Sequence, residues 1–317
     1  MSEVADAFAD AAARERRALV REIEAYGELT DPAWRGAFAE VPRHLFVPYY
    51  YVAGPAGYER LWSGDPDPER RDRWLRGAYR DTALATRVRD GELVSSASQP
   101  SLMALMLEAL DVRDGHDVLE IGAGTGYHAA LLCHRLGDRH VTTVDLDEEI
   151  AESARAHLAA AGHRPTVLTA DGARGCPERA PFGRIVATCA LPSLPYAWLP
   201  QCRPGALVLA PLSTGLLLLR VRDAAHAEGR FLNTPAYFVG LRGVAARVPR
   251  STPVGDDRFG FLYGLVGDRL DRREALALWR REGRPERERF GVTVSGGRQW
   301  AWLDEPGGPY AWPLPEA

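Results

Sequence analysis

The chain has 317 residues, of which 46% are hydrophobic and 26% charged, and its formal net charge is −4. That length is sufficient for one large domain with an appendage or for two smaller domains, and it excludes a peptide-sized scaffold. The small negative charge provides none of the basic surface by which proteins hold polyanions, so nucleic acid is not an expected partner.

The four cysteines are widely spaced and form no C-x-x-C pair, so we expect reduced thiols. The N-terminal residues lack the basic and apolar regions of a secretory leader. Nowhere does an uninterrupted apolar run reach the ~20 residues that a bilayer span requires. These features predict a cytoplasmic protein with no membrane partner, and they leave its oligomeric state open.

The first half of the chain contains two predicted helices and one segment without a clear pattern. Apolar residues recur at helical spacing from Val4 to Tyr26, which predicts an amphipathic helix. Residues 49–78 are rich in Tyr, Gly, Pro, Asp and Arg without periodicity, and we expect an irregular insertion or lid there. Pro100 suits the first turn of an apolar helix that continues to Leu110.

Beyond this helix, short apolar runs alternate with helical segments. Such alternation predicts a doubly wound, Rossmann-like α/β fold with a mostly parallel sheet and helices on both faces. The predicted strands are Val118–Ile121, Val141–Val144, Thr166–Leu168, Ile185–Thr188 and Ala206–Pro211, and the predicted helices are Tyr127–Leu136 and Glu148–Ala161.

The C-terminal part of the chain changes in composition past Gly243. Leu216–Val221 and Tyr237–Leu241 are predicted as two further strands that close the sheet, so we expect one domain over residues 1–245. Residues 246–317 are rich in Pro, Gly and Arg, and they are expected to form a small α+β domain that could recruit substrate or simply add stability. Its predicted elements are a helix at Arg272–Arg281 and paired strands at Val292–Val294 and Gln299–Leu303.

A glycine-rich turn follows the first predicted strand. Gly122, Gly124 and Gly126 have the spacing G-x-G-x-G, whereas the dinucleotide fingerprint is G-x-G-x-x-G, so NAD is disfavoured. Glu120 directly precedes the turn and would repel a pyrophosphate. An acidic approach instead suits S-adenosyl-L-methionine, which has a sulfonium cation and no phosphate. The sequence therefore predicts a site for this cofactor.

Two acidic positions at later strand ends fit the same cofactor. Asp145 ends the next predicted strand and lies where an acid accepts both ribose hydroxyls in nucleoside-binding folds, with Asp147 as a close alternative. After the third strand, Asp171 and Gly172 provide a carboxylate and a flexible turn that could receive the adenine amine. Strand, turn, helix and acid thus recur in the required order, which favours a methyltransferase.

The absence of two known motifs from the sequence limits the chemical classes of methyl acceptor that we expect. Thr188–Pro192 stands where base-methylating enzymes have Asn or Asp followed by Pro-Pro-Tyr, and no second acid follows Asp171 to hold a metal ion. A carboxylate acceptor has a pKa of ~4, so it is ionised at pH 7 and needs no general base. Positioning and exclusion of water would then suffice.

Hydroxyl and amide donors precede the apolar helix. Ser95, Ser96, Ser98 and Gln99 could bind an anionic acceptor near the start of this helix, where main-chain amides favour negative charge. Ser98 could equally cap the helix. The two roles are compatible.

Together with other stretches of residues 35–243, these residues resemble the protein-L-isoaspartate O-methyltransferase family. The resemblance implies that Ser98 is the active-site serine, beside cofactor and substrate, and that Ser95, Ser96 and Gln99 lie next to it. Arg242 stands where the family often has a hydroxyl residue, and it is likewise expected to bind the substrate. The matching stretches are Val41-Pro42-Arg43, Phe46-Val47-Pro48, Ser98-Gln99-Pro100, Val118–Tyr127, Asp171-Gly172 and Pro204-Gly205.

The resemblance implies methyl esterification of an aspartyl or isoaspartyl carboxylate in a peptide or protein, and then succinimide formation. The segment between Pro48 and Tyr79 is longer than in the family, and the tail after Gly243 has no counterpart in its repair enzymes. That tail resembles bacterial homologues of graspetide and lanthipeptide pathways, so tailoring of a ribosomal peptide is slightly preferred over isoaspartyl repair. A small-molecule methyltransferase and a non-catalytic cofactor-binding scaffold remain alternatives, and His128 and His134 are expected to be structural.

Overall fold

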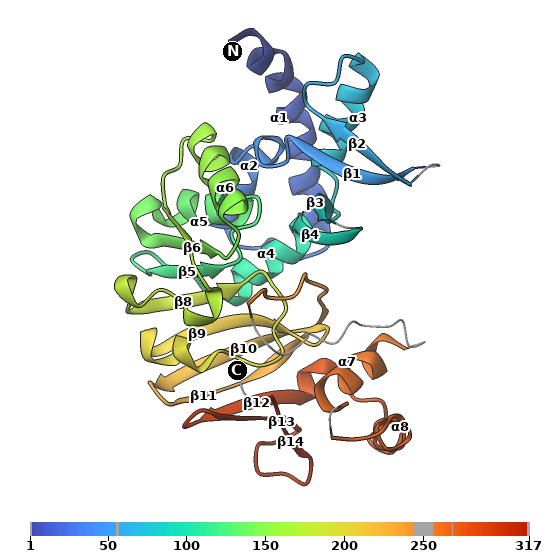
Figure 1. The fold of residues 1–317 in the computed structure, drawn as a ribbon, viewed down its shortest axis with the longest axis vertical. Coiled ribbons are helices and arrows are strands. Elements are labelled where there is room, and N and C mark those ends of the chain that lie inside the picture. Colours follow the sequence, from blue (N-terminus) through green and yellow to red (C-terminus); the bar gives the residue numbers. More distant parts are fainter. Residues whose placement is uncertain (1, 55–56, 90, 244–255, 268, 316–317) are drawn as a thin grey trace. The chain divides into compact units, whose positions relative to one another are not determined.

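The computed structural model describes residues 2–54, 57–89, 91–243, 256–267 and 269–315. The chain divides into two compact units. Unit 1 comprises residues 1–115 and 123–169, and unit 2 comprises residues 116–122 and 170–317. Each is described separately below, with the element labels of Figure 1.

Unit 1 begins with helices that pack around a small antiparallel sheet in the order β2-β1-β3-β4. Helix α2 begins where Asp31 accepts a hydrogen bond from the main-chain N–H of Ala33, with Pro32 in its first turn. The elements of this part are α1 (Ser2–Ala25), α2 (Pro32–Glu40), η1 (Arg43–Leu45), β1 (Tyr49–Gly54), β2 (Gly57–Trp62), α3 (Pro68–Ala78), β3 (Leu84–Arg89), β4 (Glu92–Ala97) and α4 (Pro100–Ala109).

The prediction of an irregular insertion at residues 49–78 is wrong, because β1, β2 and α3 lie there. Strands β1 and β2 form a hairpin with only one buried face, on which Tyr50 pairs with Leu61. Exposed Arg and Tyr residues on the other face hide the alternation from a hydropathy pattern. Helix α3 is similarly polar, and its start is fixed by Asp67, which accepts from the main-chain N–H of Glu69.

The second part of unit 1 consists of α5 (Tyr127–Leu136), η2 (Asp138–His140), β6 (Val141–Asp145), α6 (Glu148–Ala160) and β7 (Thr166–Thr169). All four predicted helices and strands are confirmed here to within one residue at each end. Strands β6 and β7 are parallel, as predicted, with Thr142 opposite Thr166. Helix α6 is capped by Asp147, which accepts from the main-chain N–H groups of Glu149 and Ile150.

A buried arginine links several segments of unit 1. The Arg43 side chain is fully buried and donates hydrogen bonds to four main-chain carbonyl oxygens, including those of Ala78 at 2.6 Å and Ser98 at 3.0 Å. The other two acceptors are the carbonyl oxygens of Arg80 and Thr82. Because one guanidinium carries several donors in a fixed plane, Arg43 fixes the chain after α3 against the chain that leads into α4.

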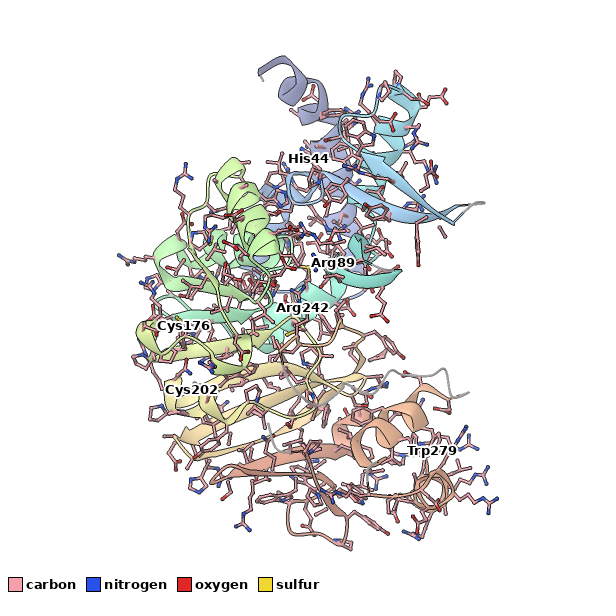
Figure 2. All side chains as sticks on the ribbon, in the orientation of Figure 1. His44, Arg89, Cys176, Cys202, Arg242 and Trp279 are labelled. Carbon is pink, nitrogen blue, oxygen red and sulfur yellow. The ribbon has the colours of Figure 1, made fainter. Side chains whose placement is uncertain are left out.

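His44, labelled in Figure 2, is expected to make the stability of unit 1 depend on pH. Burial lowers its pKa to about 4, and the charge of Arg16 adds to the shift. Since an unfolded histidine titrates near pH ~6.5, the unfolded state binds the proton first, and stability falls as the pH drops from there toward the folded pKa. We expect His44→Gln to reduce the loss of unfolding free energy between pH 7 and pH 4 by about 3 kcal/mol in denaturant titrations. An equal loss in both proteins would contradict this account of His44.

Unit 2 contains a sheet in the order β14-β13-β12-β11-β10-β9-β8-β5. Strands β5, β8 and β9 are parallel, whereas the strands from β9 to β14 pair antiparallel (Figure 1). The strands of unit 2 are β5 (Val118–Ile121), β8 (Phe182–Ala187), β9 (Cys202–Leu212), β10 (Gly215–Asp223), β11 (His226–Pro235), β12 (Phe290–Ser295), β13 (Arg298–Leu303) and β14 (Ala311–Pro313). Its helices are η3 (Gly172–Arg174), η4 (Pro177–Arg179), η5 (Tyr196–Gln201), α7 (Asp257–Val266), α8 (Arg272–Arg281) and η6 (Arg287–Arg289).

The predicted strand at Tyr237–Leu241 is wrong, because the strand that pairs with β10 is β11, at His226–Pro235. That stretch was not predicted as a strand, because the polar residues His226, Glu228 and Arg230 interrupt its apolar ones, although Ala227 and Phe231 are buried. Residues 237–241 contribute only an isolated bridge between Gly240 and Ala190.

The C-terminal segment continues the sheet of unit 2. Strand β12 pairs antiparallel with β11, from His226 opposite Ser295 to Arg230 opposite Gly291, and the predicted pairing of β12 with β13 is confirmed. Helix α8 covers the predicted range 272–281, whereas α7 was not predicted. Its side chains Phe259, Phe261 and Leu262 are buried in unit 2.

The four cysteines are free thiols, as expected from their spacing. Within the part of the chain that the structure describes, no helix is both long and apolar enough to cross a membrane.

Candidate functional site

The glycine-rich turn predicted to bind the cofactor adopts backbone conformations that favour glycine. Gly122, Gly124 and Gly126 have backbone φ angles of 97°, 53° and 87°. Residues other than glycine rarely adopt such positive φ angles. At Gly126 a Cβ atom would also lie 3.2 Å from the main-chain oxygen of Ala154 on α6. Glycine is therefore required both for the turn and for the close approach of α6.

Asp145, at the end of β6, is hydrogen-bonded to this turn. Its Oδ2 accepts from the main-chain N–H of Gly124 at 3.2 Å, and its Oδ1 accepts from that of Asp147 at 3.1 Å. The residue is 6% exposed. The neighbouring Asp147 is occupied as the cap of α6, so of the two candidate ribose ligands, Asp145 is the one that contacts the turn.

The serine segment lies against the same turn. A Cβ atom at Gly124 would be 3.7 Å from the Ser96 carbonyl oxygen and 4.0 Å from Ser95 Oγ, both at ordinary contact distance. Ser95 is buried, and its hydroxyl lies 3.4 Å from that of Thr86 on β3. The structure thus brings together Ser95, Ser96 and Gly124, which the sequence separates by almost thirty residues.

Ser98 and Gln99 lie between β4 and α4. The cap position of α4 is Gln99, without a side-chain cap bond, so the alternative that Ser98 caps this helix is wrong. The Ser98 carbonyl oxygen accepts from Arg43, whereas its half-buried hydroxyl makes no hydrogen bond to any described residue. Gln99 Nε2 instead donates to Asp81 Oδ2 and Ser101 Oγ, each at 2.9 Å. The Gln99 amide therefore links the start of α4 to Asp81. The Ser98 hydroxyl remains available for a ligand.

A small cavity of about 60 Å³ adjoins the turn and the serine segment within unit 1. Its walls come from β1, β3, β4, the turn and α6. The lining residues are Phe46, Pro48, Tyr49, Thr86, Arg87, Ser95, Gly124, Thr125, Ile150, Ser153 and His157.

His157 is held in one tautomer at the wall of this cavity. Its Nδ1 lies 3.0 Å from the Thr125 carbonyl oxygen, and since a carbonyl only accepts, Nδ1 carries the proton and Nε2 is an acceptor. Burial lowers the pKa of His157. The ring is therefore predominantly neutral at pH 7, so the histidine that lines this cavity adds no positive charge to its wall.

Arg87 was not predicted as a site residue, although it lines the cavity. Its Nη1 lies 2.6 Å from Glu149 Oε2 and 4.0 Å from Asp147 Oδ1. Arg89 on the same strand, labelled in Figure 2, is 3.8 Å from Asp147 Oδ2. These ion pairs join β3 to the first turn of α6. The sequence feature that could have indicated this role is the spacing of Arg87 and Arg89, two residues apart, which places both on one face of a strand.

The remaining predicted site residues, three for the cofactor and Arg242 for the substrate, belong to unit 2. Glu120 is fully buried on β5, and Asp171 is half-buried and caps η3 by accepting from the main-chain N–H of Ala173. Gly172 is packed so closely that a Cβ atom would lie 2.6 Å from Ile121 Cγ2. Arg242, labelled in Figure 2, is half-buried after β11.

One group of side chains in unit 1 has donor atoms near enough to hold a metal ion, namely Cys133, Asp138 and His163 within 4.8 Å of one another. Asp138 is already engaged there, with its Oδ1 3.2 Å from His163 Nδ1 and its Oδ2 accepting from the Arg164 N–H at 2.6 Å. These contacts attach η2 to the chain before β7. None of the three residues lines the cavity.

Comparison with known proteins decides the family. The model of the protein-L-isoaspartate(D-aspartate) O-methyltransferase family matches residues 70–233, more than half of the chain. The chain belongs to the protein-L-isoaspartate O-methyltransferase family. It is thus a methyltransferase enzyme, as expected from the serine segment and the glycine turn together.

Named members of the family match most of the chain. The protein-L-isoaspartate O-methyltransferase of Hyperthermus butylicus is 33% identical over 72% of this chain and 88% of its own length. The protein-L-isoaspartate O-methyltransferase 1 of an Anaeromyxobacter species is 35% identical over 72% of this chain and 95% of its own length.

Solved structures of the family show the same fold. One protein-L-isoaspartate O-methyltransferase has a TM-score of 0.64 at 23% identity, over 88% of this chain and 96% of its own. Another, from Plasmodium falciparum in complex with S-adenosyl-L-homocysteine, has a TM-score of 0.55 at 13% identity and covers 72% of this chain. The predicted α/β fold of class I methyltransferases is thereby confirmed.

These comparisons also correct the interpretation of the tail. A structure of the family covers 88% of this chain, which is more than the residues that precede the tail, so part of the tail has a counterpart in the fold of an isoaspartate methyltransferase. The expectation that it has none was wrong. Since the preference for ribosomal-peptide tailoring depended on that expectation, the comparisons give it no support.

Proposed function

We propose that this protein transfers the methyl group of S-adenosyl-L-methionine to the free α-carboxylate of L-isoaspartyl residues in peptides and proteins. The observation that carries the proposal is the packing of Ser95 and Ser96 against Gly124, beside a cavity. A glycine turn of this kind suits a cationic nucleoside cofactor, and hydroxyl groups suit an anionic acceptor. Family membership supports the isoaspartyl acceptor.

The residues of the turn fit the cofactor. Within unit 1, Gly124 leaves room beside its Cα atom, because a Cβ atom there would meet nothing nearer than 3.7 Å. Asp145 offers a carboxylate at the end of β6 for the ribose hydroxyls. Glu120, Gly122, Gly126, Asp171 and Gly172 are assigned to the same cofactor from sequence order and the family pattern.

The cofactor supplies an electrophilic methyl group, and the chain has only to position the acceptor. A carboxylate is ionised at pH 7, because its pKa is ~4, so no proton has to be removed. The reaction therefore requires no general base, whatever the protonation state of nearby side chains. The hydroxyl of Ser98 would donate to the carboxylate and orient one oxygen toward the methyl group. The resulting ester can then close to a succinimide by attack of the following main-chain nitrogen, with loss of methanol.

The acceptor is tested by transfer of labelled methyl groups to two matched peptides, one isoaspartyl and one aspartyl. We expect labelling of the isoaspartyl peptide, with kcat/KM at least roughly 100-fold higher than for the aspartyl peptide, because only one places its carboxylate correctly. Preferential labelling of the aspartyl peptide would support tailoring of ordinary aspartate instead. Labelling of a small carboxylic acid alone would support a small-molecule enzyme.

Ser98→Ala should lower kcat by roughly tenfold to 100-fold, which corresponds to loss of one hydrogen bond to a charged group. The affinity for S-adenosyl-L-homocysteine should change less than about twofold, since the hydroxyl is assigned to the acceptor rather than to the cofactor. Steady-state kinetics and calorimetry measure the two effects. Ser98→Thr, which retains the hydroxyl, should recover most of kcat. Unchanged turnover of Ser98→Ala would assign the residue to the fold alone.

A further inference from the structure

The outer face of the β1–β2 hairpin has a dense group of aromatic residues around one arginine. In the hairpin Tyr49 pairs with Trp62, Tyr51 with Arg60 and Ala53 with Tyr58, and directly paired residues share one face of a sheet. We call Tyr49, Tyr51, Tyr58, Arg60 and Trp62 the aromatic face. Tyr58 is 69% exposed and Trp62 37%, so this face is open to solvent within unit 1.

The side chains of the aromatic face are already arranged against one another. The Arg60 guanidinium carbon lies 4.5 Å from the centre of the Tyr49 ring and 5.6 Å from that of Trp62. Tyr49 and Tyr51 make an edge contact, with ring centres 6.1 Å apart. Ordered aromatic rings with an adjacent arginine provide large contact area at little cost in side-chain entropy, which is typical of protein-binding sites.

The charge of Arg60 has no acidic partner among the described residues. The adjacent Glu59 points to the opposite face, where its carboxylate pairs with Arg70 and Arg73 of α3. The two faces of the hairpin thus differ in role, because one attaches the hairpin to α3 and the other presents an uncompensated cation. A stacked guanidinium of this kind retains its planar donors for a carboxylate.

The aromatic face is continuous with the candidate site in two ways. Tyr49 also lines the cavity beside Ser95 and Gly124. In addition, one row of paired residues crosses the sheet of unit 1, from Arg60 through Tyr51 and Ala85 to Ser96. With adjacent strands ~4.8 Å apart, this row spans ~14 Å, the length of about four residues of extended peptide.

We propose that the aromatic face binds the polypeptide segment that flanks the acceptor residue, and that it selects an acidic side chain about four residues from that acceptor. The inference rests on the proposed function, since it takes Ser96 and its neighbours as the place of the acceptor. The occupant is an extended acidic segment of the substrate, because the rings offer contact area and Arg60 offers the charge that such a segment complements. Residues 49–62 lie before residues 70–233, which the family model matches. The proposed selectivity would therefore depend on residues outside the segment that this model describes.

The test uses isoaspartyl peptides of equal length with Glu, Gln or Lys four residues from the acceptor, on either side of it. For the unmodified protein, KM should be about tenfold lower with Glu than with Lys on one of the two sides, and kcat should be equal. Arg60→Glu should reverse the order of the two peptides. The matched control Arg21→Glu, at an exposed position of α1, should leave the order unchanged.

A second pair of variants tests the rings. Tyr58→Ala should raise KM severalfold for the isoaspartyl peptides that carry the flanking residue. The value of kcat/KM should stay constant for a minimal isoaspartyl peptide, which is too short to reach the aromatic face. The control Tyr26→Ala removes a ring that is 63% exposed and lies outside the hairpin, and it should change neither value. Equal KM values for the Glu and Lys peptides in every protein would overturn the proposal. A self-association that Arg60→Glu abolishes would overturn it too, by assigning the face to a second copy of the chain.

Binding measured without turnover separates this proposal from the proposed function. Fluorescence anisotropy of the labelled peptides in the presence of S-adenosyl-L-homocysteine should show the same preference for Glu and the same reversal in Arg60→Glu. If that preference is present while no peptide is methylated, the docking face stands and the methyl-transfer assignment fails. If the minimal peptide is methylated without any influence of the flanking charge, the docking face fails alone.

Discussion

Asp145→Ala should weaken the binding of S-adenosyl-L-homocysteine by roughly 100-fold and reduce methyl transfer at least as much. The Asp145 carboxylate accepts from the N–H of Gly124, and in our account it also accepts from the ribose of the cofactor. The alanine variant would lose the two hydrogen bonds that the ribose hydroxyls donate to this carboxylate. At about 1.5–3 kcal/mol for each hydrogen bond to a charged group, their loss is sufficient for such an effect. Isothermal titration calorimetry measures the affinity directly.

The neighbouring Asp147 provides the matched control. Asp147→Ala removes a helix cap, which should cost about 1 kcal/mol of stability, but cofactor affinity should change only a few-fold. Asp145→Asn retains one carbonyl acceptor for the turn and should lie between the original protein and the alanine variant. If Asp147→Ala weakened the affinity more than Asp145→Ala did, the ribose would have to be assigned to Asp147.

Arg43→Met should lower the free energy of unfolding by about 3–5 kcal/mol, the largest effect on stability that we predict. The fully buried Arg43 donates to four main-chain oxygens, among them that of Ser98. Methionine fills similar space but leaves these acceptors without a donor. Denaturant unfolding at pH 7, monitored by circular dichroism, measures the difference.

The control for Arg43 is the exposed Arg35, which pairs with Glu24 on the surface of unit 1. Arg35→Met should cost less than about 1 kcal/mol, as exposed ion pairs usually do. A similar loss in both variants would show that Arg43 does not hold the chain before α4. If Arg43→Met remains folded under assay conditions, its kcat should fall, since the Ser98 main chain loses its donor.

The parts of the fold that the sequence predicted best are those with strong hydrophobic contrast. Strand β5 and helix α5 are matched to the residue, because buried apolar runs flank a turn with three glycines. Asp145 was predicted to bind the cofactor from its place at a strand end, and the structure shows its hydrogen bond with Gly124. Ser95 and Ser96 were predicted to lie beside the acceptor from donor chemistry and family resemblance, and the structure adds their contact with Gly124.

The parts that were missed have polar residues on one face or depend on distant contacts. Strand β11 and the β1–β2 hairpin combine buried residues with polar or aromatic ones, so their hydropathy resembled that of loops. The role of Arg43 could not be read from its neighbours, because its acceptors lie 35 to 55 residues further along the chain. The ion pairs of Arg87 similarly require the structure, because Glu149 is 62 residues away.

Methyl transfer to isoaspartate is tested most directly by a time course that is followed by mass spectrometry. An isoaspartyl peptide incubated with the protein and S-adenosyl-L-methionine should first gain one methylene mass and then lose methanol as the succinimide forms. Hydrolysis should afterwards return part of the peptide to the aspartyl form. Unchanged isoaspartyl peptide, in a preparation that binds S-adenosyl-L-homocysteine, would show that the protein does not methylate isoaspartate.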